Sequence, residues 1–301
     1  MAEFRILGPL EVVERDRALA LGGRQQRAVL VVLVLHRGEL VSTERVIDEL
    51  WGERAPASAA KTVQGYVSHL RKVLGGGVIV TEGRGYRLAV APGQVDAGRF
   101  ELLSAEGRRA LSEGDPVRAR ERLCSALGLW RGEPLAEFAY EPFAQAAVAR
   151  LREARLLALE DRIDAELAAG SDGELIGELE SLVAVNPLQE RLRGQLMLAL
   201  YRAGRQADAL AVYRQTSDLF REELALDPSP WLQKLERAIL EHDASLVGAT
   251  PARAAARTCQ SPRGRACPPA SIPPAAPAGP KRGARARKST PRRRDQRTQA
   301  L

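Results

Sequence analysis

The stretch from Ser58 to Leu74 constrains the fold more than any other, because its apolar residues repeat with the period of an α-helix. Val63, Val67, Leu70 and Leu74 follow one another at intervals of four, three and four residues. On a helix with 3.6 residues per turn, these positions form one apolar stripe that packs against a core. The stretch therefore predicts an amphipathic helix with one face left for solvent or for a ligand.

Local signals in this stretch predict where the helix begins and ends. The hydroxyl of Ser58 can accept an N–H of the first turn, and the glycines at 75–77 let the chain turn away after Leu74. Gly65 stands in the middle of the helix, where glycine costs about 1 kcal/mol relative to alanine. A gap at this position would let a partner approach the backbone closely.

The face opposite the stripe has the composition of a surface that binds nucleic acid. It carries Lys61, Gly65, Ser68 and Lys72, with Thr62, Gln64 and His69 beside them, and no acidic residue. Cations suit phosphates, and small polar side chains suit base edges. A merely solvated helix face can have the same composition, so the neighbouring elements must decide between the two interpretations.

The segments around this helix form a definite order of elements. Short strands are expected at residues 4–7, 11–13 and 18–21, then a buried helix at 24–35 and a second helix that Ser42 caps and that ends at Trp51. Beyond the glycines, residues 78–81 and 86–88 predict a hairpin. Three helices and a hairpin predict a winged helix-turn-helix with a small β layer, whose third helix enters the major groove.

Residues 93–248 predict a helical domain, so we expect the chain to be mainly α. Helices are expected at residues 96–113, around 119–126, and at 142–169, 175–185, 188–203, 206–222 and 230–241. Ala119, Leu123 and Ala126 have the small-large-small spacing of tetratricopeptide-like repeats. Residues 249–301 are rich in proline, alanine and arginine and poor in large apolar side chains, which predicts a disordered basic tail.

The three segments, 1–92, 93–248 and 249–301, share the net charge of +7 unevenly. They carry +3, −8 and +12 respectively. The acidic middle segment does not favour broad contact with nucleic acid, whereas both ends can attract phosphates. For the tail, an unselected extension with no binding role is the alternative.

The sequence contains none of the motifs that would indicate an enzyme. It has no GxxxxGK[ST], HExxH, GxSxG or CxxC motif, so we expect no catalytic residues and no cofactor. Its three cysteines, Cys124, Cys259 and Cys267, match no zinc-ligand spacing, so no metal site is expected either. No apolar run approaches the length of a membrane span, and the first residues do not look like a signal peptide. A cytoplasmic protein with no membrane partner is therefore predicted.

Several phrases of the sequence resemble one bacterial family. KTVQGYVSHLRKVL followed by EGRGYRL resembles the OmpR-type winged helix of response regulators, and FRILGPLEVV with LWGERAPASAAKTVQGYVSHLRKVLG resembles the Streptomyces antibiotic regulatory protein family more narrowly. ALGLWRGEPL, NPLQERLRGQLMLALYRAGRQADALAVYR and EELALDPSPWLQKLERAIL resemble the bacterial transcriptional activator domain that follows the winged helix in that family. The resemblance covers residues 4–243.

The resemblance implies roles in DNA binding for residues of the third helix, the wing and the preceding loop. Positions that mostly hold phosphates in the family are occupied here by Lys61, Thr62, Tyr66, Arg71 and Lys72, and positions that face base edges by Gln64, Gly65, Ser68 and His69. Arg84 lies near the wing tip, which can reach the minor groove, and Arg54 lies in a loop that approaches DNA and RNA polymerase. For Tyr66, Arg71 and His69, packing or simple exposure is the alternative.

The resemblance also implies a function. It predicts a transcription activator of a secondary-metabolite gene cluster that binds direct repeats in promoter DNA near the −35 element. Two protomers, in tandem or as a homodimer, would engage RNA polymerase holoenzyme through the helical domain. Two other interpretations stay open: a helical-repeat adaptor that binds a protein or small molecule and is only localised by DNA, and a repressor of the same fold.

Overall fold

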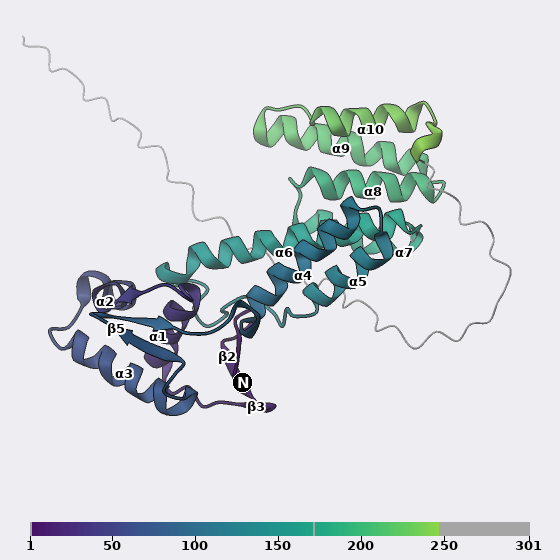
Figure 1. The fold of residues 1–301 in the computed structure, drawn as a ribbon. Helices are drawn as coiled ribbons and strands as arrows, with labels where there is room; N and C mark the ends of the chain where they lie inside the picture. The colour runs from purple at the N-terminus through teal and green to yellow at the C-terminus, as the bar shows by residue number, and fades with distance from the viewer. Residues whose placement is uncertain (1, 171, 247–301) are drawn as a thin grey trace, which may run out of the picture.

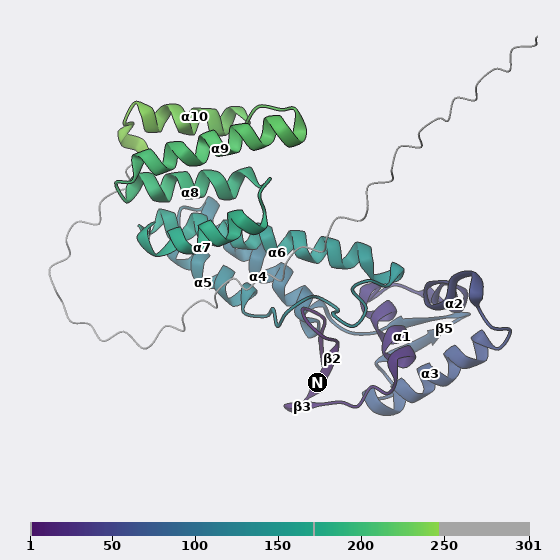
Figure 2. The same cartoon turned by 180° about the vertical axis from the view of Figure 1, so that it is seen from behind.

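The computed structural model describes residues 2–170 and 172–246, and it is mainly helical, as predicted (Figure 1). A small N-terminal part holds both sheets and the first three helices, and a stack of antiparallel helices extends away from it (Figures 1 and 2). The predicted disordered tail lies outside the described residues. Within the described ranges, no helix is long and apolar enough to cross a membrane.

The N-terminal β layer is an antiparallel sheet in the order β1-β2-β3, in which the first and third strands are shorter than predicted and the second is one residue longer. The strands are β1 (Glu3–Arg5), β2 (Glu11–Glu14) and β3 (Arg17–Ala18). The third strand was expected at 18–21, but it begins at Arg17 because Arg15 and Asp16 adopt positive φ angles and form a tight hairpin turn. Beyond β3, Leu19 adds one more backbone hydrogen bond, from its N–H to the carbonyl of Val12.

The winged helix consists of three helices and a second small sheet. The elements are α1 (Arg24–Leu35), β4 (Val41–Ser42), α2 (Thr43–Trp51), the 3-10 turn η1 (Gly52–Arg54), α3 (Ala59–Leu74), β5 (Ile79–Glu82) and β6 (Gly85–Leu88). The sheet has the order β4-β6-β5, and sequence patterns did not predict β4 because it has two residues only. Ser42 caps α2 as predicted, since its Oγ accepts the N–H of Arg45 at 3.0 Å.

The prediction that the Ser58 hydroxyl caps α3 is wrong. Ser58 has φ −88° and ψ 5°, and its side chain makes no capping hydrogen bond. With this near-helical backbone, its carbonyl accepts the N–H and the hydroxyl of Thr62 instead, at 3.0 and 3.1 Å. The other end of α3 is as predicted, because Gly75 adopts φ +95° directly after Leu74.

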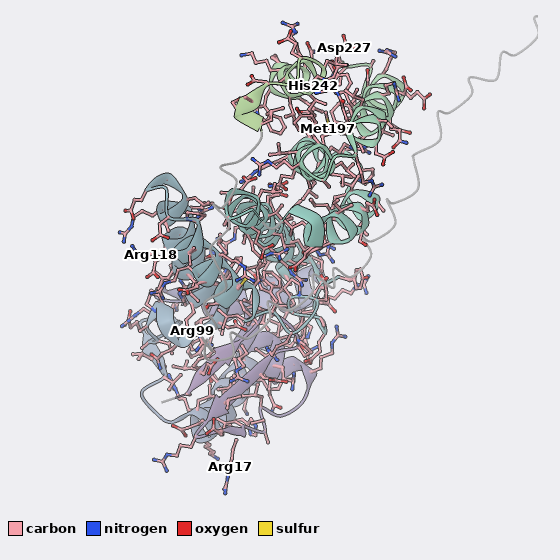
Figure 3. The ribbon with its side chains drawn as sticks, turned by 90° about the vertical axis from the view of Figure 1, so that its right-hand side faces the viewer. Arg17, Arg99, Arg118, Met197, Asp227 and His242 are labelled. Carbon is pink, nitrogen blue, oxygen red and sulfur yellow. The ribbon has the colours of Figure 1, made fainter. Side chains whose placement is uncertain are left out.

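The helical part stacks its helices pairwise. The elements are the turn η2 (Pro92–Gln94), α4 (Asp96–Ser112), α5 (Pro116–Leu127), α6 (Pro142–Ala168), α7 (Asp172–Val185), α8 (Glu190–Arg202), α9 (Gln206–Leu224), α10 (Pro230–Leu240) and the turn η3 (Ala244–Leu246). The predicted helices are all present, although α7 begins three residues before the expected 175. Figure 3 shows Asp227 and His242 at the opposite end of the molecule from Arg17.

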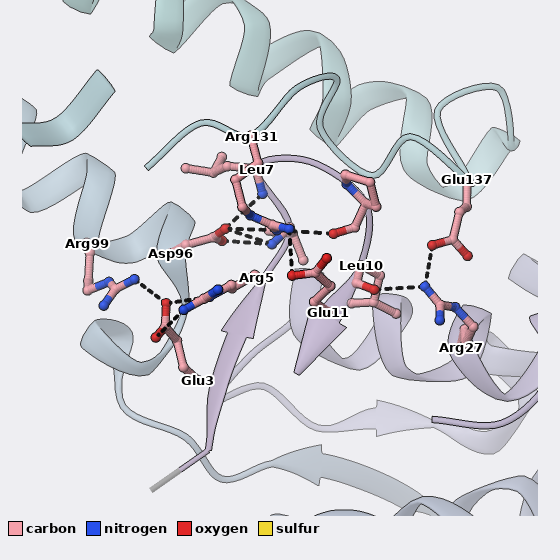
Figure 4. A network of polar contacts seen from close by, with 12 residues as sticks. Glu3, Arg5, Leu7, Leu10, Glu11, Arg27, Asp96, Arg99, Arg131 and Glu137 are labelled. Carbon is pink, nitrogen blue, oxygen red and sulfur yellow. Dashed lines mark hydrogen bonds and ion pairs between the residues drawn. The ribbon is translucent and has the colours of Figure 1, made fainter. Parts of the chain in front are cut away.

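The N-terminal strands are joined directly to the helical part (Figure 4). Phe4 forms an isolated parallel bridge with Val95, just before α4. The Asp96 carboxylate, only 1% exposed, accepts the N–H groups of Ile6 at 2.8 Å and of Leu7 at 3.0 Å. One continuous cluster of buried apolar side chains runs from the winged helix into the helical stack. The boundary at residue 92 is therefore not a gap between separate cores.

Candidate nucleic-acid interface

The recognition-helix candidate α3 has the predicted division into two faces. Its inner stripe is buried, with Val63 and Leu70 at 0% exposure and Val67 at 1%. Its outer face is exposed at Lys61, Gln64, Gly65, Ser68 and Lys72. A Cβ atom added to Gly65 would meet no other atom within 4 Å, so the gap at this position opens outward.

Ion pairing separates the basic side chains of the winged helix into two groups. Most arginines pair with carboxylates, as Arg45 does with Glu49 and Arg24 with Glu141 of the helical part. In the described part of the chain, the exposed basic side chains at residues 2–92 that form no ion pair or hydrogen bond are Arg15, Arg17, Arg54, Lys61, Lys72 and Arg84. The last four were predicted to meet DNA, and they have no protein partner to give up when a phosphate binds.

Arg15 and Arg17 were not singled out from the sequence. Both lie on the β2–β3 hairpin, where they alternate with the exposed Glu14 and Asp16. The charges of these four residues cancel, so the turn does not extend the basic face of α3. The sequence could not show that these two arginines form no ion pair, because pairing depends on where the fold places the carboxylates.

Four of the predicted contact residues on α3 are partly buried, namely Thr62, Tyr66, His69 and Arg71. The Thr62 hydroxyl is occupied by the Ser58 carbonyl, and Tyr66 packs against the core. The His69 ring faces the segment before α1, where a Cβ atom added to Gly22 would lie 2.9 Å from its Nε2 atom. That Nε2 atom is buried and has no hydrogen-bond partner among the described residues. These placements favour packing over contact with a base edge for His69, and packing over contact with a phosphate for Tyr66.

Arg71 points toward the wing. Its Nε donates to the carbonyl of Ile79 at 2.8 Å, and one terminal nitrogen donates to the Thr81 hydroxyl at 2.6 Å. The guanidinium also lies over the ring of Tyr86, 6.0 Å from the centroid. Arg71 thus contacts both strands of the hairpin, whereas its neighbour Lys72 is exposed and unpaired.

The wing tip is held from a second side. Gly83 and Arg84 form the turn between β5 and β6, with φ +55° at Gly83. The backbone N–H and the hydroxyl of Thr43 donate to the Arg84 carbonyl at 3.0 and 2.9 Å. The carbonyl is therefore fixed to the start of α2, while the Arg84 side chain is exposed.

A cleft of about 980 Å³ opens between α2, η1 and the start of α6. Its lining includes the apolar Leu50, Trp51 and Phe143, together with charged side chains of both signs such as Arg54 and Asp48. The sequence patterns singled out Arg54 and Trp51 but not the cleft, because its two walls are almost a hundred residues apart. Among the described residues, no group of histidine, cysteine or acidic side chains could hold a metal ion.

Comparisons with known proteins agree with this division of the chain. A model of the bacterial transcriptional activator domain matches residues 95–240, and a model of the C-terminal domain of transcriptional regulatory proteins matches residues 17–88. The structure of EmbR from Mycobacterium tuberculosis, in complex with a low-affinity phosphopeptide, superimposes with a TM-score of 0.77 at 35% identity. That match covers 80% of this chain and 65% of the EmbR chain.

The match to this chain covers very different shares of the length of two curated relatives. The regulatory protein AfsR of Streptomyces coelicolor is 45% identical over 85% of this chain, which spans only 26% of the length of AfsR. The regulatory protein DnrI of Streptomyces peucetius is 36% identical over 80% of this chain, and the match covers 93% of DnrI. Because these relatives and both domain models describe transcriptional regulators and not enzymes, the chain belongs to the Streptomyces antibiotic regulatory protein family of transcriptional regulators.

Proposed function

We propose that the chain is a sequence-specific transcription activator that reads promoter DNA with α3. The observation that carries the proposal is the composition of the outer face of α3. The unpaired Lys61 and Lys72 flank the exposed Gln64 carboxamide and the open position at Gly65, and no acidic residue lies between them. Such a face matches what the major groove presents, namely phosphates at the edges and hydrogen-bonding base edges in the middle.

The exposed residues divide into two proposed roles. Gln64, Gly65 and Ser68 lie in the middle of the face and would meet base edges, whereas Lys61 and Lys72 lie toward its ends and would meet phosphates. Arg84 would reach the neighbouring minor groove or backbone from the wing tip, and Arg54 would approach the DNA from the loop before α3. Thr62, Tyr66 and His69 would support the face by packing.

The biological setting of the proposal rests on the family. From the resemblance to this family we propose that two protomers bind side by side to direct repeats near the −35 element and recruit RNA polymerase. We also propose a secondary-metabolite gene cluster as the target and a cytoplasmic location. The continuous core between the two parts supports one feature of this picture. A helical part that cannot swing freely would place its surface at a constant position beside the DNA.

A second candidate function is the adaptor, for which DNA contact serves only to localise the protein. The cleft between α2 and α6 is the observation that favours it, since ligand sites occur preferentially where domains meet. A repressor of the same fold has no observation in its favour that the activator lacks. Transcription from the bound promoter, measured with and without the protein, separates activator from repressor.

The proposed function is tested by Gln64→Ala and Lys72→Ala. A glutamine carboxamide can pair with adenine through two hydrogen bonds, so its loss should cost roughly 1–3 kcal/mol on the best site and little on a scrambled duplex. Lys72→Ala should weaken both duplexes alike and reduce the slope of log K against log salt by about 1. The measurement is a fluorescence-anisotropy titration of the full chain at several salt concentrations.

Two further variants sharpen this experiment. Gly65→Leu should prevent the backbone of α3 from approaching the DNA closely. It should not weaken the helix, because leucine is a better helix former than glycine. Arg214→Ala removes an exposed cation on α9, far from α3, and should change neither affinity nor slope. Identical profiles for Gln64→Ala and Lys72→Ala would show that the assignment of base and phosphate roles is wrong, and normal binding by Gly65→Leu would show that this face does not enter the groove.

A further inference from the structure

We propose that Arg71 is a positioning residue, which sets the wing against α3 and does not itself hold a phosphate. This inference rests on the proposed function, because it concerns how the same DNA-binding face is built. The neighbouring Lys72 supplies the contrast, since it lies one residue away and is exposed and unpaired.

Two of the five N–H donors of Arg71 are committed to the wing. A guanidinium has a rigid planar arrangement of N–H groups, so two hydrogen bonds to one strand fix both its position and its plane. Here those bonds run to the Ile79 carbonyl and the Thr81 hydroxyl of β5. The ring of Tyr86, which stands opposite Thr81 on β6, lies against the guanidinium. These contacts hold the guanidinium against the wing, so a phosphate could reach only the remaining terminal N–H groups, and Arg71 could not turn toward it without giving them up.

The wing is clamped at two separated points. Arg71 holds the middle of β5 from the last turn of α3, and Thr43 holds the Arg84 carbonyl from the start of α2. In the sheet β4 pairs with β6 alone, over two residues, so β5 is an edge strand on the side away from β4. The two clamps therefore turn α2, α3 and the wing into one rigid unit.

This rigidity determines where Arg84 meets DNA. With the wing fixed, the exposed Arg84 side chain falls at a constant distance from the bases under Gln64, and no ordering of the wing is needed on binding. Without Arg71, the hairpin must become ordered when the protein binds, and the free energy of this ordering reduces what the Arg84 contact contributes to binding. Loss of Arg71 should then remove most of the contribution of Arg84, although the two side chains need not touch.

The experiment is a double-mutant cycle on a duplex that the full chain selects from a random pool. Arg84→Ala should weaken binding roughly tenfold, as loss of a charge-assisted hydrogen bond does. Arg71→Ala should weaken it by a similar factor, and adding Arg84→Ala to it should cost less than about twofold more. The salt slope of the double variant should fall by about 1 in total, whereas two independent phosphate contacts would lower it by about 2.

Thr81→Val removes one partner of Arg71 without touching any cation. It should weaken binding in the same direction as Arg71→Ala and reduce the effect of Arg84→Ala. Lys72→Ala is the matched control, and its loss should add in full to that of Arg84→Ala. Additive losses for Arg71 and Arg84, or wild-type binding by Thr81→Val beside weakened binding by Arg71→Ala, would overturn the positioning role.

Hydrogen exchange of the free protein tests the same role without DNA. In Arg71→Ala, amides of residues 79–88 should exchange faster than in the wild type, while those of α1 keep their protection. Unchanged exchange in the wing would overturn the inference even if binding falls. Failure of the wild-type chain to prefer any duplex would instead overturn the proposed function, and exchange in the wing would still decide on Arg71.

Discussion

Asp96 is the residue through which the start of the chain is attached to the helical part. Its carboxylate accepts N–H groups of Ile6, Leu7 and Ala97, and Arg131 lies 3.8 Å away. Burial raises the pKa of the Asp96 carboxyl, against the opposing effect of these hydrogen bonds and of Arg131. Buried N–H groups must have acceptors, so the amides of Ile6 and Leu7, directly after β1, depend on this one side chain.

Asp96→Asn should therefore lower the free energy of unfolding by about 1–3 kcal/mol, because an asparagine NH2 group would face the Leu7 amide and leave it without an acceptor. Asp115→Asn is the matched control, since Asp115 also accepts a backbone N–H, from Arg118 at 3.0 Å, but at the exposed N-cap of α5. Asparagine caps helices as well as aspartate, so that variant should change stability by less than about 0.5 kcal/mol. Urea denaturation measures both, and equal losses would contradict the role given to Asp96.

At the scale of elements, the helical part depends on close approach between neighbouring helices. A Cβ atom added to Gly107 of α4 would lie 2.5 Å from Cγ of Leu123, which is fully buried on α5. A Cβ atom added to Gly194 of α8 would lie 2.2 Å from the ring of Trp231 on α10. Glycine at these positions lets the helices pack at short range, and at Gly107 the neighbouring side chain is fully buried, whereas Trp231 is 51% exposed.

Gly107→Ala should destabilise the protein by about 1–3 kcal/mol, because Leu123 has no free space into which it could move. Gly177→Ala provides the control on α7, where an added Cβ atom would meet nothing within 4 Å. There the better helix propensity of alanine should stabilise the protein by up to about 1 kcal/mol. Opposite signs in thermal or urea unfolding are expected, and a stabilising Gly107→Ala would refute the close-packing account of α4 and α5.

At the scale of the whole molecule, the N-terminal part and the helical part are joined by a β-bridge, by hydrogen bonds and by one continuous core. The N–H of Arg131 donates to the Leu7 carbonyl at 2.8 Å, and that of Leu135 donates to the Ile6 carbonyl at 3.0 Å. Arg27 of α1 pairs with Glu137, which lies just before α6. The loop between α5 and α6 thus binds both the segment between β1 and β2 and the start of α1 (Figure 4).

We expect the full chain to unfold in one cooperative transition, since neither part can lose its structure without exposing buried groups of the other. Hydrogen exchange at increasing denaturant is the measurement, with peptides from α1 and from α6 losing protection together. A fragment of residues 1–92 lacks Asp96 and the loop, and it should be markedly less stable than the same residues within the full chain. Separate midpoints for α1 and α6 would show that the parts unfold independently.

Much of the architecture follows from local patterns in the sequence alone. The apolar stripe of α3, the Ser42 cap and Gly75 act within a few residues, so their effects do not depend on distant partners. The boundaries of α4, α6 and α9 also lie within a few residues of those predicted. The exposed face with Lys61, Gln64 and Lys72 was visible from the same periodicity.

The roles of individual polar side chains depended on contacts between segments far apart in the chain. Asp96 looked like the ordinary first residue of a helix, yet it accepts the amides directly after β1, about ninety residues earlier in the chain. Arg71 and Lys72 are both cations in the last turn of α3, and only the position of β5 separates the bound one from the free one. Hydrophobic periodicity determines which face of a helix is buried, but the partner of a charged group depends on which segments the fold brings together.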